Sequence, residues 1–264
     1  MLSTREGDLG SASEARDDRV AEALRDAVQT MNEAGFEIHH PVSVAIDAKL
    51  PFMGYTMPQD GRFTIVVSGM AADSKMLEGL LIHELSHIYR MQTNHPSHNG
   101  QLLTEAFRSL GYKELSEMYK QRILRDLVND IQDLYSDEIA VRVMIQSGAI
   151  SKRELTAFLQ SWVKDEPVES GNTKRDRWLN LAIMAKNARA ISQMRNQAIP
   201  DAGGKAASSN ERFLALLPSE LSRHNAYFES LLSNLKEDVS EEAYRSFLRH
   251  YLNKFVSVAE GGEA

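Results

Sequence analysis

The residues best suited to chemistry are His83-Glu84-Leu85-Ser86-His87, in an otherwise mostly apolar stretch. Histidines four residues apart on a helix share one face, so both imidazoles can bind a single metal ion. Zinc accepts imidazole nitrogens in tetrahedral geometry, and one helix can supply two of its ligands. Glu84 is rotated by about 100° from His83. Its carboxylate would border the metal, where we expect it to act as general base toward water.

A structural role for these residues requires partners, because two imidazoles and a carboxylate are costly to bury without them. The chain has no cysteine. Any metal site must therefore be built from histidine and carboxylate, and a disulfide framework is excluded.

A catalytic zinc site needs a third protein ligand. The metzincin pattern, with a third histidine six residues after His87, fails because position 93 is Thr and position 90 is Arg. His95 and His98 follow in a loop at the wrong spacing, and we expect both to be solvated loop residues.

A better candidate for the third ligand lies further along, in Asp130-Ile-Gln-Asp133-Leu-Tyr-Ser-Asp137-Glu138. Asp133 and Asp137 are again one helical turn apart on one face of an apolar-patterned helix. We expect the Asp133–Asp137 pair to face the metal. A surface position is sufficient to explain Glu138.

These two motifs together resemble those of the gluzincin metallopeptidases, which include thermolysin and the CAAX-prenyl/heat-shock protease group. That family pairs His-Glu-x-x-His with a downstream Glu-x-x-x-Asp, and Asp133-Leu-Tyr-Ser-Asp137-Glu-Ile-Ala140 matches this spacing. The resemblance covers about residues 40–145. It implies that Asp133 takes the third-ligand position, that Asp137 orients a ligand histidine, and that a strand, here Arg62–Ser68, precedes the motif helix.

The sequence departs from the family pattern at the third ligand. Asp133 stands where the family usually has Glu, which is longer by one methylene. The two helices would have to approach more closely, or Asp130 or Glu138 would be the ligand instead. The last 120 or so residues have no counterpart that we can name. The prenyl and heat-shock proteases span membranes, and this chain would be a soluble relative.

Composition and charge exclude several classes of protein. The 264 residues carry a net charge of −7, which provides no basic field for nucleic acid. No apolar run reaches the roughly 18–20 residues that a membrane span needs. The first residues lack the apolar stretch of a secretory signal. We therefore expect a soluble, cytoplasmic protein.

Periodicity predicts an α+β fold that is predominantly α. We expect a flexible tail over 1–17, a zincin-like metallopeptidase domain over 18–150 and a helical C-terminal region over 151–258 packed on it. The segments 42–46 and 62–68 are typical of strands in a small antiparallel sheet, with a turn over Met57–Gly61. The expected helices are 18–34, one capped by Asp73 or Ser74 and ending near Gln92, 101–109, 113–146, 152–164, 174–197, 211–236 and 241–256.

The function that these patterns favour is a zinc-dependent metallopeptidase. Zinc would be held by His83, His87 and Asp133, with Glu84 as the catalytic residue and a peptide or protein as substrate. An extended peptide would add to an edge strand near 62–68. The alternative is a non-catalytic, zinc-stabilised helical protein that binds a partner.

Other residues receive no decisive role from the sequence. Gluzincins commonly bind the oxyanion with an extra His or Tyr, for which Tyr135, His224, Tyr227 and His95 are open candidates. His39, His40 and His250 have no supporting neighbours. The amphipathic stripes of the C-terminal helices favour core packing and are also compatible with a homo-oligomer.

Overall fold

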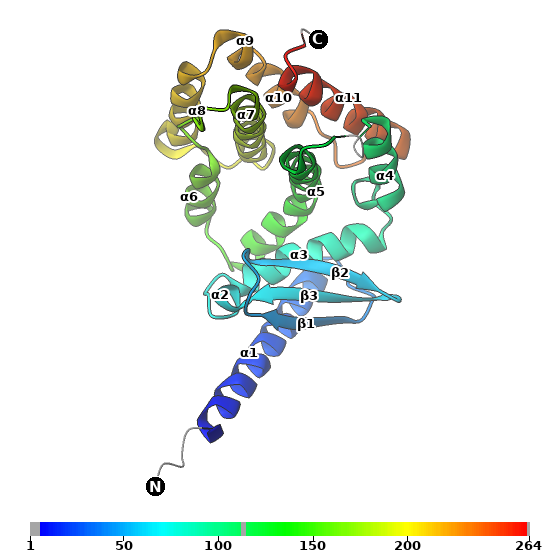
Figure 1. The fold of residues 1–264 in the computed structure, drawn as a ribbon. Helices are drawn as coiled ribbons and strands as arrows, with labels where there is room; N and C mark the ends of the chain where they lie inside the picture. The colour runs from blue at the N-terminus through cyan, green and yellow to red at the C-terminus, as the bar shows by residue number, and fades with distance from the viewer. Residues whose placement is uncertain (1–5, 112–114, 263–264) are drawn as a thin grey trace. The chain divides into compact units, whose positions relative to one another are not determined.

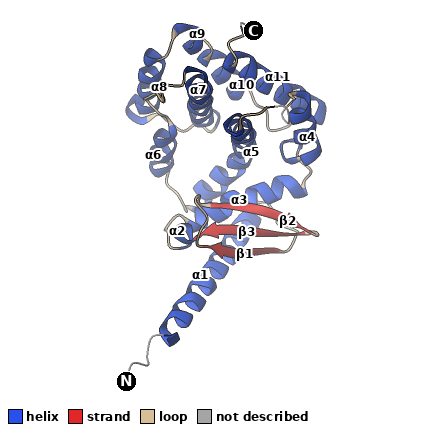
Figure 2. Ribbon diagram, in the orientation of Figure 1, coloured by secondary structure: helices blue, strands red, loops and turns tan. Residues whose placement is uncertain are grey.

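The computed structural model describes residues 6–111 and 115–262 and confirms an α+β, predominantly helical fold with one small sheet (Figures 1 and 2). The elements in chain order are α1 Glu6–Glu33, β1 Val42–Asp47, β2 Gly54–Gln59, β3 Arg62–Ser68, α2 Gly69–Ala72, α3 Leu77–Gln92, η1 Pro96–His98, α4 Gly100–Ser109, α5 Met118–Ser147, α6 Lys152–Trp162, α7 Thr173–Asn196, η3 Ala202–Gly204, α8 Lys205–Leu216, α9 Ser219–Ser222, α10 Asn225–Ser233 and α11 Glu241–Ala259.

The chain forms two compact units. The first contains the described residues up to His95 together with Ser136–Ile150, and the second contains Pro96–Tyr135 together with the chain from Ser151 onward. Residues 96–135, which we expected in the first domain, thus belong to the second unit. Helix α5 contributes to both units and is continuous through the boundary.

The first helix is longer than its apolar pattern indicates. It begins at Glu6, within the segment for which we expected a tail, while residues 1–5 lie outside the described part of the chain. It ends at Glu33, where Gly35 adopts the positive φ of 87° that a helix stop requires. The stop was therefore predicted correctly and the start was not.

The sheet is mixed, and the expectation of an antiparallel sheet was wrong. Its order is β1-β3-β2, with β1 parallel and β2 antiparallel to the central strand β3 (Figure 2). The β2–β3 hairpin closes through Asp60 and Gly61 alone, whose φ values of 47° and 78° are those of a type I′ turn. Pro58, expected in the turn, lies in β2, where an edge strand tolerates its missing N–H.

The interior of the first unit lies between the sheet, α1, α3 and the end of α5. Strand β3 is central and nearly fully buried, which explains its run of β-branched residues. One continuous apolar core joins these elements; its members include Leu24, Met31, Ile65, Val67, Leu81, Leu85, Ile88, Ile139 and Val143. This core holds α3 and the 136–147 part of α5 in one rigid arrangement.

Helix starts and breaks differ from the expectation at three places. Neither cap expected for α3 is used, because its N-cap is Met76 without a side-chain cap bond. Asp73 pairs with Arg16 at 2.9 Å and with Arg19 at 2.8 Å, and the Ser74 hydroxyl accepts from the backbone N–H of Met76 at 3.0 Å. The predicted helix start at Lys113 lies outside the described residues, and α5 begins at Met118. The single helix expected over 211–236 is three helices, interrupted at Pro218, which cannot continue a helix.

The second unit is all helical and packs around a large aromatic core. Its fully buried rings include Trp178, Phe213, Phe228, Tyr244, Tyr251 and Phe255. The stripe on α7 is buried at Leu181, Met184 and Ala188, as core packing predicts, whereas Leu216 on α8 is exposed.

Candidate metal centre

The motif helix α3 is enclosed on almost all sides, as its apolar composition predicts. Leu81, Leu85 and Ile88 are fully buried in the core of the first unit. The hydroxyl of Ser86 is also buried and donates to the carbonyl of Ile82 at 2.7 Å, so this polar group is satisfied within the helix.

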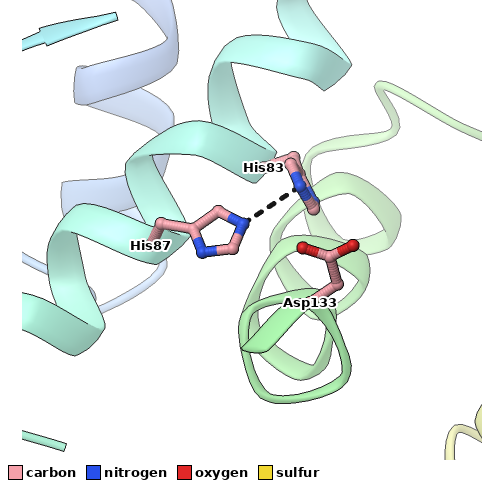
Figure 3. Close-up of side chains that lie close together, drawn as sticks. All are labelled: His83, His87 and Asp133. Atoms are coloured by element: carbon pink, nitrogen blue, oxygen red, sulfur yellow. Dashed lines mark hydrogen bonds between the residues drawn. The ribbon is translucent and has the colours of Figure 1, made fainter. Parts of the chain in front are cut away.

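The two histidines turn the same ring nitrogen toward one another. The Nε2 atoms of His83 and His87 are 3.2 Å apart, and both side chains are half-buried (Figure 3). Two nitrogens each bound at about 2.0–2.1 Å to one tetrahedral zinc ion would lie roughly 3.3–3.4 Å apart. The observed distance is therefore close to that between two imidazole nitrogens bound to one metal ion.

The opposite ring nitrogens are both held by residues of α5. Nδ1 of His83 lies 2.7 Å from Oδ1 of Asp137, and Nδ1 of His87 lies 3.1 Å from the Ser136 hydroxyl. A carboxylate can only accept, so Asp137 accepts a hydrogen bond from Nδ1 of His83 and orients this ring with its Nε2 toward His87. Asp137 thus lies where the family resemblance implies a residue that orients a ligand.

Asp133 brings a carboxylate to the same place. It lies one turn before Asp137 on the continuous helix α5, so its side chain shares the face that carries Asp137. Single ligand atoms of His83, His87 and Asp133 all lie within 4.8 Å of one another. Figure 3 shows the carboxylate of Asp133 directed toward the two imidazoles.

The two alternative ligands have other partners. Asp130 pairs with Arg189 at 3.4 Å, and Glu138 pairs with Arg142 at 3.4 Å. Burial raises the pKa of Asp130 despite the nearby guanidinium. Within residues 6–111 and 115–262, neither residue belongs to the group that could hold a metal ion, so the geometry favours Asp133.

Glu84 is directed toward the sheet. Its side chain is only 5% exposed, and its Oε2 accepts a hydrogen bond of 2.8 Å from the hydroxyl of Thr56. Thr56 lies on β2, an edge strand, and its hydroxyl also lies 3.3 Å from the backbone carbonyl of Glu84. The carboxylate next to the histidines is therefore held against an edge strand of the sheet.

The remaining candidates are the possible oxyanion residues and the two loop histidines. Tyr135 is buried, with its ring 6.0 Å from that of Tyr244, and Tyr227 lies edge-on to His250 at 5.8 Å. His224 is buried at the start of α10, and burial lowers its pKa. His95 and His98 are half-buried, contrary to the solvated loop positions that we expected.

Three residues at this centre were not found from the sequence. Ser136 and Thr56 touch the motif residues, and Arg189 lies 3.5 Å from Asp133. Ser136 lies within the segment that carries the family resemblance, but its contact with His87 has no signal in the sequence. Thr56 and Arg189 have no local signal, because their roles depend on tertiary contacts.

The donor set fits zinc. Two imidazoles with their Nδ1 atoms already engaged, plus one carboxylate, make a His₂-carboxylate set, which is the ligand type of a catalytic zinc site with one open position. A purely structural site usually has four protein ligands. Among the described residues, no fourth His or acidic residue joins the group.

Comparison with known proteins assigns a family without an activity. The chain belongs to the family described as "Family of unknown function (DUF5781)", whose model matches residues 15–194. The match includes both motifs and Arg189. No curated protein and no solved structure matches the chain. Over the described part of the chain, no helix combines the length and apolar character that crossing a membrane requires.

Proposed function

We propose that this protein is a zinc-dependent metallopeptidase in which His83, His87 and Asp133 hold the metal and Glu84 is the catalytic residue. The observation that supports it most strongly is the pair of Nε2 atoms at 3.2 Å, with both Nδ1 atoms engaged by residues of α5. When bound, zinc would polarise the substrate carbonyl and acidify water.

The chain's own residues supply the proton transfers. Glu84 accepts a proton from the attacking water as its oxygen bonds to the carbonyl carbon of the peptide. It then delivers the proton to the amide nitrogen as the carbon–nitrogen bond breaks. The hydrogen bond from Thr56 holds one carboxylate oxygen, Oε2, which leaves Oε1 for this exchange.

The strand to which a substrate would add is not the one that we expected. The strand 62–68, which we expected to receive the peptide, is the central strand, so both of its edges are already paired. The edge strand that contacts Glu84 is β2 through Thr56. We infer that an extended peptide adds to the free edge of β2, where main-chain hydrogen bonds would align it next to Glu84.

The alternative is a non-catalytic protein in which the metal stabilises the packing of α3 and α5. The observation that favours it is the low exposure of Glu84 and its bond to Thr56, since a buried, bonded carboxylate can be structural. The proposal requires that Glu84 exchange protons with water, whereas this alternative does not.

The test measures zinc content and peptide hydrolysis for the parent, Glu84→Gln and Asp133→Ala. We expect Glu84→Gln to keep zinc and to lose at least about 100-fold in hydrolysis rate. Asp133→Ala should lose zinc, while Glu138→Ala, on the same helix, should keep it. If the parent and Glu84→Gln bind equal amounts of zinc and the parent hydrolyses no peptide, the non-catalytic alternative is supported. Zinc retained by Asp133→Ala would contradict the ligand set.

A further inference from the structure

A buried arginine lies against the proposed metal ligand. Arg189 of α7 is 8% exposed, and its Nη2 lies 3.5 Å from Oδ2 of Asp133. Its Nη1 lies 3.4 Å from Oδ1 of Asp130. The guanidinium also lies over the ring of Trp162, 4.6 Å from the ring centre. One cation is thus held by two carboxylates of α5 and an aromatic face of α6.

These contacts fix the guanidinium in one place. A planar guanidinium can contact two acceptors at once, and an aromatic face adds a cation–π attraction that grows with burial. Asp130 is only 14% exposed at its side chain, and its Oδ2 is buried without a hydrogen-bond partner among the described residues. Asp130 is thus committed to Arg189 rather than to water.

The contact of Arg189 with Asp133 is about as long as its contact with Asp130. Its 3.5 Å is an ion-pair distance and exceeds the usual length of a charge-assisted hydrogen bond. The guanidinium therefore attracts the carboxylate of Asp133 and orients it through Oδ2. Asp133 and Asp130 are also three residues apart on one helix, where two unpaired carboxylates would repel each other.

We propose that Arg189 is a positioning residue for the metal centre: anchored by Asp130 and Trp162, it orients the carboxylate of Asp133 for the metal. This inference rests on the metal site of the proposed function. Residues that orient metal ligands typically contribute 10–100-fold to metal affinity. Arg189 would do so from α7, which supplies no ligand itself.

The experiment compares metal binding by the parent, Arg189→Gln and Arg189→Lys in the full chain. Zinc affinity is measured by competition with a chromogenic chelator, and bound cobalt(II) is followed by its visible absorption, which reports ligand geometry. Arg189→Gln should weaken zinc by about 10–100-fold and alter the cobalt spectrum. Arg189→Lys keeps the charge but lacks the fork, so its affinity should lie between the two.

A matched control lies on the same helix. Arg195 is 57% exposed at its side chain and pairs with Glu229 at 2.5 Å, so Arg195→Gln removes an arginine ion pair without touching Asp133. Its zinc affinity and cobalt spectrum should equal those of the parent. Because Arg189→Gln leaves Asp130 unpaired, the double variant Asp130→Asn/Arg189→Gln removes both charges together. It should fold and still show the weakened zinc binding.

The outcomes separate this inference from the proposed function. If the parent binds zinc and Asp133→Ala loses it, but Arg189→Gln and the double variant bind as tightly as the parent, the positioning role is wrong and the metal site stands. Tighter binding by Arg189→Gln would also overturn it, because Arg189 would then compete with the metal. If the parent does not bind zinc, the metal site itself is wrong.

Discussion

Asp137 offers the sharpest test of how the metal centre is held. Its Oδ1 lies 2.7 Å from Nδ1 of His83, within the range of a charge-assisted hydrogen bond, and its side chain is only 9% exposed. Little water is available to replace it. Loss of such a partner of a ligand histidine weakens metal binding by about 10–100-fold, or roughly 1.4–2.7 kcal/mol.

The change to make is Asp137→Ala, with Asp137→Asn as the milder variant, because an amide oxygen can still accept from Nδ1 but carries no charge. We expect zinc affinity to fall in the order parent, Asp137→Asn, Asp137→Ala. The assay is equilibrium competition with a chelator of known zinc affinity, with thermal unfolding in EDTA measured in parallel to separate metal binding from stability of the apo chain.

The neighbouring Glu138 provides the control. It carries the same charge on the same helix but pairs with Arg142 on the surface. Glu138→Gln should therefore leave zinc affinity unchanged. If Asp137→Ala binds zinc as tightly as the parent, Asp137 does not hold the metal centre in place. If Glu138→Gln lowers zinc affinity to the same degree as Asp137→Ala, the loss is a general effect of charge.

Two further changes test the surroundings of the centre and the second unit. Thr56→Val removes the hydroxyl that lies 2.8 Å from Glu84 and should lower the free energy of unfolding by about 1–3 kcal/mol. The control is Thr64→Val, which removes a hydroxyl that bonds to Ser43 and should lower this free energy by less. Equal losses for the two variants in chemical denaturation would contradict the bond to Glu84. Lys120 is a buried residue, 3% exposed, and its ammonium lies 2.6 Å from the carboxylate of Glu260. Lys120→Met removes this ammonium and should lower the free energy of unfolding by about 1–3 kcal/mol at pH 7. The bond from Lys120 lowers the pKa of Glu260 below its ordinary 4.5, so this stabilisation is present above pH 4.5 and is lost as the pH falls through the lowered pKa; a gap between parent and variant that persists in strong acid would contradict it.

Helical spacing was sufficient to predict the parts of the centre that depend on one element. His83 and His87 meet because residues four apart on any helix share a face, and α3 forms where its apolar pattern indicates. The same argument applies to Asp133 and Asp137 on α5. These relations are local, so they do not depend on how the elements pack.

Relations between elements could not be obtained in the same way. The parallel pairing of β1 with β3 depends on the path of residues 48–53, which have no distinctive pattern. The turn was misplaced because Pro58 is tolerated in an edge strand as well as in a turn. Arg189 was missed because its partners lie 56 and 59 residues away, and only the packing of α7 against α5 brings them together.

The division of labour between the helices explains why the centre depends on the register of α5. Helix α3 supplies both imidazoles, and three residues of α5 at i, i+3 and i+4 lie beside them: Asp133, Ser136 and Asp137. These positions share one helical face, so a single register brings all three to their partners. Gly79 of α3 allows a close approach to this helix, since a Cβ there would meet the sulfur of Met144 at 3.3 Å. Close helix packing would compensate for an aspartate ligand that is shorter by one methylene than the glutamate of the family pattern.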